Sequence, residues 1–177
     1  MVENIIKDYV KSYGLNAAVL RYFNAAGAHS SGKIGEAHDP ETHLIPNIIK
    51  SMLNKNTNLK IFGNDYNTSD GTCIRDYVHV CDLADAHVMA LKHIKDDNCF
   101  LQLNLGNGNG FSVLDIIKSI ERVSNEKIKF SIEKRRLGDP DILIADSSEA
   151  KSLGWRTNYS EIDDITSSAL HWHKNSI

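Results

Sequence analysis

Two arginines in separate loops are the residues of this sequence best suited to chemistry on an anion. Arg75 follows the polar stretch 64–72, and Arg136 lies in the segment KRRLGDP at 134–140. A guanidinium group can bind two phosphate oxygens at once, so two arginines that converge from separate loops would suit a diphosphate. The alternative is a pair of ordinary salt bridges, of Arg75 with Asp76 and of Arg136 with Asp139. Spacing alone leaves both interpretations open.

Tyr22, Phe23 and Asn24 form a second candidate group, directly after a predicted strand. Ligands of open α/β sheets bind beyond the carboxyl ends of the strands, so these side chains could meet a ring and polar groups of a ligand. The alternative is that the two aromatic rings pack in a core and that Asn24 caps a turn.

A third candidate is the start of the helix predicted after Thr42 and His43, with Pro46 in its first turn. Free N–H groups and the helix dipole at such a start can hold a phosphate, although most helix starts hold none.

Histidine, cysteine and glycine patterns give no further site. The eight histidines, His38 and His43 among them, show no H-E-x-x-H or comparable spacing, so we expect satisfied or solvated side chains and no metal. Three cysteines without a C-x-x-C spacing predict neither a disulfide framework nor a zinc site. The glycines of LGNGNGF at 105–111 alternate instead of following G-x-G-x-x-G, which favours a tight strand-to-helix turn.

Composition limits the partners. The 20 basic and 23 acidic side chains give a net charge of −3, so no nucleic acid or anionic membrane is indicated and any anion must be bound locally. The N-terminus is amphipathic rather than signal-like, and no apolar run approaches about 18 residues. We therefore expect no membrane association and a cytoplasmic location.

The elements that must position these candidates alternate between strands and helices, which predicts an α/β protein. Apolar residues at three- and four-residue spacing predict helices at 2–13, 43–54, 81–94, 113–123 and 162–172. Ser112 with Asp115 and Ser160 with Asp163 resemble capping boxes, and the 81–94 helix is expected to carry Ala84, Val88, Leu91 and Ile94 on one face. Strands are predicted at 16–23, 59–63, 76–80, 100–106, 127–134 and 141–146.

With these segments placed, the chain resembles the UDP-glucose 4-epimerase family of extended short-chain dehydrogenases/reductases. The stretch IFGNDYNTSDGTCIRDYVHVCDLADAH at 61–87 is similar to a signature loop of that family. LRYFNAAGAHSSGKIGE, ETHLIP, NLGNGNGFSVLDII and RRLGDP match in the same order. The resemblance implies an incomplete Rossmann-like parallel sheet, from residues 1–24 and about 73–110, and a smaller mixed α/β substrate-binding lobe, from about 25–72 and 111–177.

The resemblance also implies a role for each candidate residue. Tyr22 would lie against the nicotinamide side of NAD, and Phe23 beside the sugar or cofactor. The remaining residues would bind the UDP-sugar: Asn24 its phosphate and sugar side, His43 and Leu44 the diphosphate from the helix start, Lys60, Ile61 and Phe62 the uracil, Arg75 and Arg136 the diphosphate, Asp139 a ribose hydroxyl, and Tyr77 the pocket wall. Leu143 stands where the family often has a tyrosine that limits pocket size, so an N-acetylated sugar could be admitted.

The family reaction is interconversion of UDP-glucose and UDP-galactose through a 4-keto sugar with bound NAD. The glycine-rich turn that seats NAD and the catalytic Tyr-x-x-x-Lys pair of the family are absent from this sequence, so no catalytic residue is assigned. We expect a C-terminal portion that is inactive alone, exposes a sheet edge beside its first strand, and pairs as a homodimer or with a missing N-terminal half. The alternatives are a UDP-N-acetylhexosamine or uronate 4-epimerase portion, and a non-catalytic nucleotide-sugar-binding or interaction module.

Overall fold

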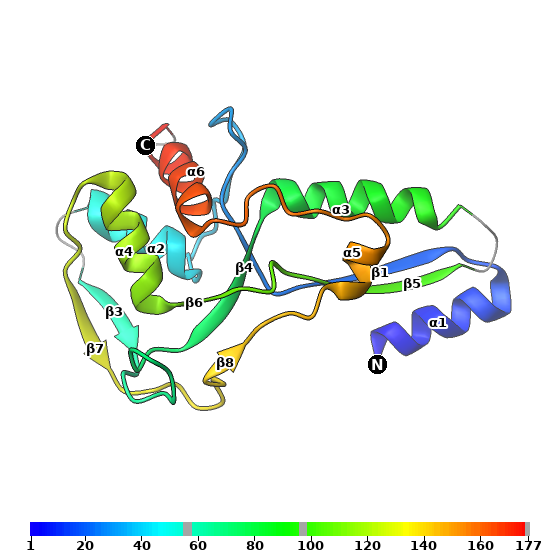
Figure 1. Ribbon diagram of the computed structural model, residues 1–177, viewed down its shortest axis with the longest axis horizontal. Coiled ribbons are helices and arrows are strands. Elements are labelled where there is room, and N and C mark those ends of the chain that lie inside the picture. Colours follow the sequence, from blue (N-terminus) through cyan, green and yellow to red (C-terminus); the bar gives the residue numbers. More distant parts are fainter. Residues whose placement is uncertain (55–57, 96–98, 176–177) are drawn as a thin grey trace.

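Two hydrophobic cores lie toward opposite ends of the molecule, and strand β4 (Ile74–His79) contributes to both of them (Figure 1). The computed structural model describes residues 1–54, 58–95 and 99–175. Successive side chains of β4 point in opposite directions, so Tyr77 packs in one core and Val78 in the other. One strand therefore connects the two halves of the structure.

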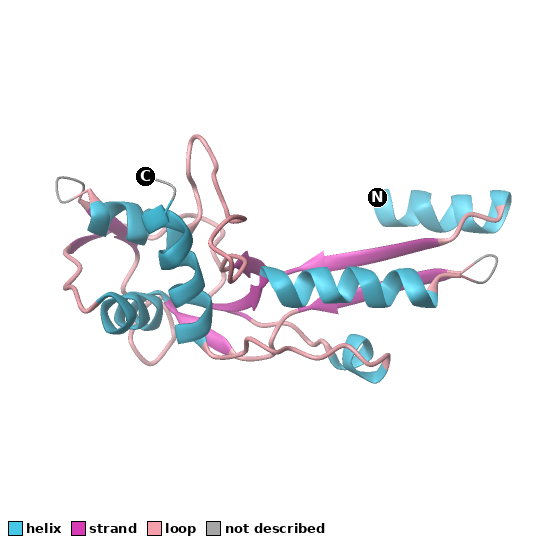
Figure 2. Cartoon of the chain, turned by 90° about the horizontal axis from the view of Figure 1, so that it is seen from above, coloured by secondary structure: helices cyan, strands magenta, loops and turns pink. Residues whose placement is uncertain are grey.

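The first half, called the sheet region here, is built on the parallel pair β1 (Ala17–Tyr22) and β5 (Phe100–Leu105). Helices α1 (Val2–Tyr13) and α3 (Val80–His93) run alongside these strands, as Figure 2 shows, and the short α5 (Ser148–Ser152) contacts β5. Its core consists of Val78, Leu83, Ala86, Leu103, Leu105, Ala150 and Trp155.

The second half, called the helical lobe here, packs α2 (Leu44–Leu53), α4 (Val113–Ser124) and α6 (Ile162–Asn175) together. The parallel pair β3 (Leu59–Phe62) and β7 (Phe130–Glu133) lies beside them (Figure 1). Isoleucines dominate its core: Ile45, Ile48, Ile49, Ile61, Ile116, Ile117, Ile120, Ile128, Ile162 and Ile165.

A small mixed sheet forms the junction between the halves. Strand β4 pairs in parallel with β2 (Asn24–Ala26) and with β8 (Ile142–Leu143), and antiparallel with β6 (Gly110–Ser112). The fully buried Asp76 of β4 accepts hydrogen bonds from the backbone N–H groups of Asn107, Gly108 and Ala145. Its carboxylate thus ties the loops after β5 and after β8 to the central strand.

The structure confirms the α/β class, the Rossmann-like parallel arrangement, and the existence of each predicted long helix. Gly14 ends α1 with φ 68°, a left-handed conformation that glycine adopts without steric cost. The predicted capping box of α4 is present in both directions, because Ser112 accepts from the N–H of Asp115 and Asp115 accepts from the N–H of Ser112. The three cysteines form no disulfide.

The apolar face predicted for the 81–94 helix is its exposed face. Ala84, Val88 and Leu91 are exposed, whereas Leu83, Ala86 and Ala90 are buried. The buried residues also show three- and four-residue spacing, and Asp82 belongs to the same buried face. Its carboxylate accepts hydrogen bonds from the N–H groups of Asn158 and Tyr159. A polar residue with its own backbone partners therefore faces inward, which apolar periodicity alone cannot indicate.

The strand predicted at 141–146 is reduced to the two residues of β8, both of them exposed. The rest of that segment is not part of the strand, and the N–H of Ala145 donates to Asp76. The short elements β2, β6 and α5 are not predicted, since three to five residues show no usable periodicity. Among the described residues, no helix combines the length and the apolar character that a membrane crossing requires.

Candidate functional site

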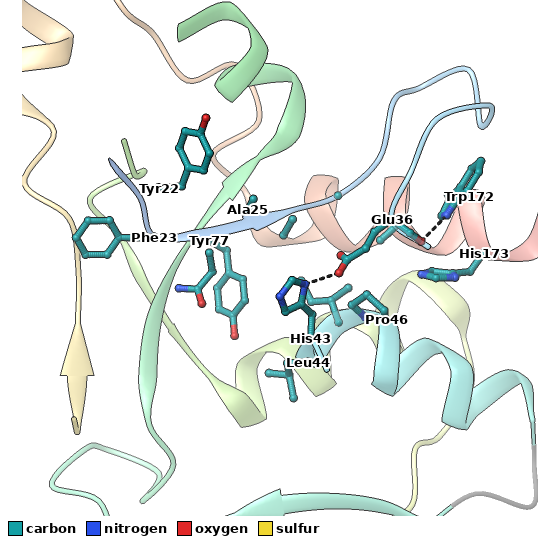
Figure 3. Close-up of a pocket in the computed structure, with 15 residues that line it drawn as sticks. Tyr22, Phe23, Ala25, Glu36, His43, Leu44, Pro46, Tyr77, Trp172 and His173 are labelled. Atoms are coloured by element: carbon teal, nitrogen blue, oxygen red, sulfur yellow. Dashed lines mark hydrogen bonds and ion pairs between the residues drawn. The ribbon is translucent and has the colours of Figure 1, made fainter. Parts of the chain in front are cut away.

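Two adjoining cavities lie between the carboxyl end of β1, the start of α2 and the inner face of the helical lobe. The first, of about 300 Å³, is bounded by the segment 22–27, by the start of α2 and by α6 (Figure 3). The second, of about 420 Å³, is bounded by the start of α2, β3, β4 and the loop that carries Arg136. Asn24, His43, Leu44 and Tyr77 line both cavities, so the two form one continuous site.

The second cavity brings together most of the residues predicted to bind a nucleotide sugar. Nine of them line it: Asn24, His43, Leu44, Lys60, Ile61, Phe62, Arg75, Tyr77 and Arg136. These residues come from β2, the start of α2, β3, β4 and the loop after β7, which are far apart in the sequence. Only the folded chain makes them neighbours.

The two arginines of the second cavity share one carboxylate. Arg136 donates from Nε to Asp139 Oδ2 at 3.0 Å, and Arg75 Nη2 lies 3.8 Å from Asp139 Oδ1. Arg75 also donates from Nη1 to the carbonyls of Ile74 and Pro140, both at 2.8 Å, so its guanidinium group is held in place. Two cations with one shared anion leave an excess of positive charge that suits a phosphate.

The salt bridge considered for Arg75 with Asp76 is wrong, because Asp76 points into the protein and is fully buried. The pairing considered for Arg136 with Asp139 is confirmed. Asp139 itself lies behind the two arginines, outside the residues that line either cavity. Leu143 also lies outside both linings; it pairs with Arg75 in the β4–β8 register and is 46% exposed.

Strand β3 offers a flat surface in the second cavity. Lys60 and Phe62 point outward, and the guanidinium carbon of Arg136 lies 5.1 Å from the centroid of the Phe62 ring. The side chain of Ile61 belongs to the core, so this residue can offer a ligand chiefly its backbone groups. An aromatic face beside backbone hydrogen-bonding groups is suited to a planar heterocycle.

The start of α2 supplies backbone donors. Helix α2 begins at Leu44 after His43, and Glu41 Oε1 already accepts from the N–H groups of Thr42 and His43. Pro46 has no N–H, so Leu44 and Ile45 carry the N–H groups of the first turn, which have no intrahelical acceptor. A phosphate at this point would also meet the positive end of the helix dipole.

Tyr77 and Cys73 stay uncharged in the second cavity. Burial raises the pKa of the Tyr77 phenol far above its ordinary value. Burial likewise raises the pKa of the Cys73 thiol, although Arg75 acts in the opposite direction. Tyr77 can therefore exchange hydrogen bonds with a ligand but does not provide a phenolate base.

In the first cavity, Tyr22 and Phe23 lie at the carboxyl end of β1 (Figure 3). The hydroxyl of Tyr22 is 2.7 Å from His87 Nε2, and His87 Nδ1 is 2.8 Å from the carbonyl of Leu83. Since that carbonyl can only accept, Nδ1 carries the proton and Nε2 accepts from Tyr22. Tyr22 and Phe23 thus lie in the first cavity, which shares Asn24, His43, Leu44 and Tyr77 with the second.

Two N–H groups of the loop LGNGNGF bind a buried carboxylate instead of a ligand. The N–H groups of Asn107 and Gly108 donate to Asp76 at 2.8 and 2.9 Å. A side chain at Gly106 would collide with Asp76, since a Cβ there would lie 2.5 Å from its Oδ2. The glycines therefore allow the turn to close on a buried carboxylate.

A group of four side chains before α2 was not predicted as a unit. Glu36, His38, Glu41 and His43 each place one potential metal-ligating atom within 4.8 Å of the others. The signal in the sequence is E-x-H-x-x-E-x-H within eight residues. Because this spacing does not match a helical metal-binding pattern such as H-E-x-x-H, it predicts only a loop.

Taken together, these features define a Rossmann-like α/β protein with a small-molecule site whose polar groups are arranged for an anion. The model of the NAD dependent epimerase/dehydratase family matches residues 1–106, and the chain belongs to this family.

Known relatives sharpen the comparison. The chain is 48% identical over 176 residues to a UDP-glucose 4-epimerase of Lactobacillus helveticus, covering 99% of this chain and 53% of that protein. It matches the structure of UDP-glucose-4-epimerase from Stenotrophomonas maltophila with bound NAD and formylated UDP-arabinopyranose, with TM-score 0.92, 38% identity, and 99% of this chain and 53% of that one covered. It matches the enzyme from Bifidobacterium longum in complex with NAD+ and UDP with TM-score 0.90, 39% identity, and 98% and 52% coverage. The chain thus spans about half the length of the curated relatives it matches.

Proposed function

We propose that this protein carries the UDP-sugar-binding part of a UDP-glucose 4-epimerase. The observation that carries the proposal is the second cavity, in which nine predicted nucleotide-sugar residues from five parts of the chain meet. The names of the relatives supply the particular nucleotide sugar.

In this proposal the nucleotide lies along the second cavity. Phe62 and the backbone of Ile61 contact the uracil, Arg75 and Arg136 bind the diphosphate, and the start of α2 donates N–H groups to it. Asp139 reaches a ribose hydroxyl from behind the arginines. Its present contacts with both arginines would then weaken as the phosphates take its place.

The sugar would extend into the first cavity, past Asn24 and Tyr77, toward Tyr22. Asn24 is held there by a 2.8 Å hydrogen bond from its Nδ2 to the carbonyl of Asp76. The fit to NAD rests on one residue, Tyr22, which is 46% exposed at the carboxyl end of β1. When bound, NAD supplies the oxidising and reducing chemistry at C4 of the sugar.

Turnover requires a group that moves the proton of the sugar 4-hydroxyl. The printed sequence contains no Tyr-x-x-x-Lys pair, and the buried phenol of Tyr77 cannot serve as the base because its pKa is raised. We therefore propose that the 177-residue chain alone binds a UDP-sugar but does not epimerise it. A rate above background with purified chain, NAD and UDP-galactose would contradict this.

Calorimetric titration with UDP tests the binding site itself. Arg75→Ala and Arg136→Ala should each weaken UDP binding by more than about tenfold, or roughly 1.4 kcal/mol. Arg156→Ala is the matched control, because Arg156 contacts the backbone carbonyls of Lys151 and Trp155 and lines neither cavity. Equal UDP affinity in all three variants, or no binding by folded protein, would refute the proposed site.

A UDP-N-acetylhexosamine 4-epimerase is a second candidate, which rests on the family resemblance at one position. Leu143, half exposed beside Arg75 and outside both cavity linings, stands where the family often has a larger tyrosine. Leu143→Tyr should then weaken binding of UDP-N-acetylglucosamine more than binding of UDP-glucose. Equal loss for both sugars would remove this candidate. Association with a second copy, or with a chain that supplies the Tyr-x-x-x-Lys pair, stays a prediction for sedimentation analysis.

A further inference from the structure

The Glu36, His38, Glu41 and His43 group, called the His/Glu cluster here, lies where the loop before α2 folds back on itself. His38 Nδ1 is 2.9 Å from Glu36 Oε1, and His43 Nδ1 contacts the same oxygen. Figure 3 shows the side chains of Glu36 and His43 pointing toward each other. Two imidazole nitrogens therefore converge on one carboxylate oxygen.

The loop holds these groups from two sides. The carbonyl of Glu36 accepts from Trp172 Nε1 of α6 at 2.9 Å (Figure 3). Gly35 lies against the same ring, since a Cβ there would be 2.3 Å from Trp172. At the other end, Glu41 accepts from two backbone N–H groups and from Lys50 Nζ. The backbone at Glu36 and the carboxylate of Glu41 are thus held by partners other than the histidines before any ligand arrives.

The charge of the cluster favours a cation. Glu36 and Glu41 supply two negative charges, and Lys50, 3.3 Å from Glu41, supplies one positive charge. Burial and the nearby Lys50 lower the pKa of His173, so His173 does not add a second positive charge near the cluster. The carboxylates are 17% and 5% exposed while the imidazoles are 56% and 57% exposed, so an ion can enter from the histidine side.

The distances suit a small transition-metal ion. Zinc binds histidine nitrogen and carboxylate oxygen with bonds of roughly 2.1 Å, so tetrahedral ligand atoms lie about 3.4 Å apart. The separation of His38 Nδ1 from Glu36 Oε1, 2.9 Å, is slightly shorter than this value, so a small outward shift of the exposed imidazole would admit the ion. Oε1 of Glu41 already accepts two N–H bonds, which leaves Glu36, His38 and His43 as the direct ligands.

We propose that Glu36, His38 and His43 bind a divalent transition-metal ion, zinc in the first instance, with Glu41 as the anionic group behind them. Two imidazoles and one carboxylate leave an open coordination position for water or a ligand oxygen. Glu36, His38 and His43 all line a third cavity, and His43 also lines the first and the second, so the ion would lie beside the candidate site. The proposal does not depend on the proposed function, since zinc alone is the probe.

The competing explanation is that the cluster only fixes the loop to α2 through hydrogen bonds between histidine and carboxylate. Such a cluster would be satisfied without an ion and would bind zinc no better than scattered surface histidines. Zinc affinity therefore separates the two explanations.

The test is isothermal titration of tag-free, chelator-treated protein with zinc chloride. We expect one zinc ion per chain, with binding at least tenfold weaker in His38→Ala and in Glu36→Gln. His93→Ala is the matched control, because His93 is an exposed histidine at the end of α3 that contacts the carbonyl of Leu153 and lies outside the cluster and the cavities around it. Circular dichroism verifies that each variant is folded; His38 is exposed, and Glu36→Gln preserves the side-chain shape.

Two results would overturn the proposal. One is the absence of saturable zinc binding by folded wild-type protein. The other is binding that survives His38→Ala and Glu36→Gln but is lost in Cys81→Ala, since Cys81 lines the neighbouring apolar cavity with His38 and His43.

Discussion

The helical lobe and the sheet region both contain amphipathic helices, but the apolar faces of these helices are buried to very different extents. In α4, Ile116, Ile117 and Ile120 are all buried against α6 and its neighbours. In α1, Val10 is buried whereas Ile5 and Tyr9 are 48% and 53% exposed. An amphipathic pattern therefore predicts that a helix has an apolar face, but it does not predict how completely that face is covered.

Strands β1 and β4 also differ in how completely their residues are buried. β1 pairs with β5 on one side, and no other described strand pairs with it, which fits the predicted open edge. Its residues are half-buried or exposed, although the sequence predicts a strand covered on both faces. In β4, by contrast, the last four residues are buried, because both cores and three neighbouring strands surround it.

The largest expected effect is the difference in lost stability when an isoleucine is shortened in each of the two regions. Ile120→Ala removes a fully buried side chain from the helical lobe and should lower the free energy of unfolding by about 2–5 kcal/mol. Ile5→Ala makes the same chemical change on α1 and should cost less than about 1 kcal/mol. Urea unfolding measures both, and equal losses would contradict the difference in burial.

The next effect concerns the junction that joins the regions. Asp76→Asn replaces an acceptor oxygen that faces buried N–H groups and should lower the free energy of unfolding by about 1–3 kcal/mol. Asp85→Asn, an exposed change on α3, is the control and should be nearly neutral. If the Asp76 variant unfolds like the control, the carboxylate is not what couples the two regions.

A smaller effect comes from the capping of α4. Ser112→Ala removes the side-chain acceptor for the N–H of Asp115 and the donor to Asp70 Oδ2, and should lower the free energy of unfolding by about 1–2 kcal/mol. The comparison with α1 is direct, because Met1 provides no side-chain hydrogen bond at that helix start. Ser167→Ala, on the exposed face of α6, should leave thermal stability unchanged; a similar loss there would show that the effect is not due to capping.

The smallest expected effect is a pH dependence of stability at Asp70, which accepts a hydrogen bond from Ser112 at the start of α4. Burial raises the pKa of Asp70, but hydrogen bonds from Ser112 and Thr72 outweigh this and leave the pKa below its ordinary value. A lowered pKa contributes stability above the unfolded value of about 3.9 and loses it as the pH falls through the folded value. Unfolding at stepped pH below about 4 should therefore show a steeper loss in the wild type than in Asp70→Asn.

Local features were predictable because the interacting residues are close in sequence. The Ser112–Asp115 box and the Gly14 stop depend on residues within one turn, and both are as predicted. The partner of Arg75 was not, since neighbouring residues of a strand point to opposite faces. Asp76 therefore faces the interior, and Asp139 reaches Arg75 from a loop more than sixty positions further along the chain.

The alternation of helices and strands, the approximate helix ends, and the residue types available to bind an anion follow from local sequence patterns. Which of these residues meet depends on the folding of the whole chain. It brought nine predicted ligand residues into one cavity, left Asp139 behind the arginines and Leu143 beside them, and gathered two histidines around Glu36. The physical reason is that periodicity and capping are local, whereas convergence depends on strand pairing and helix packing between distant segments.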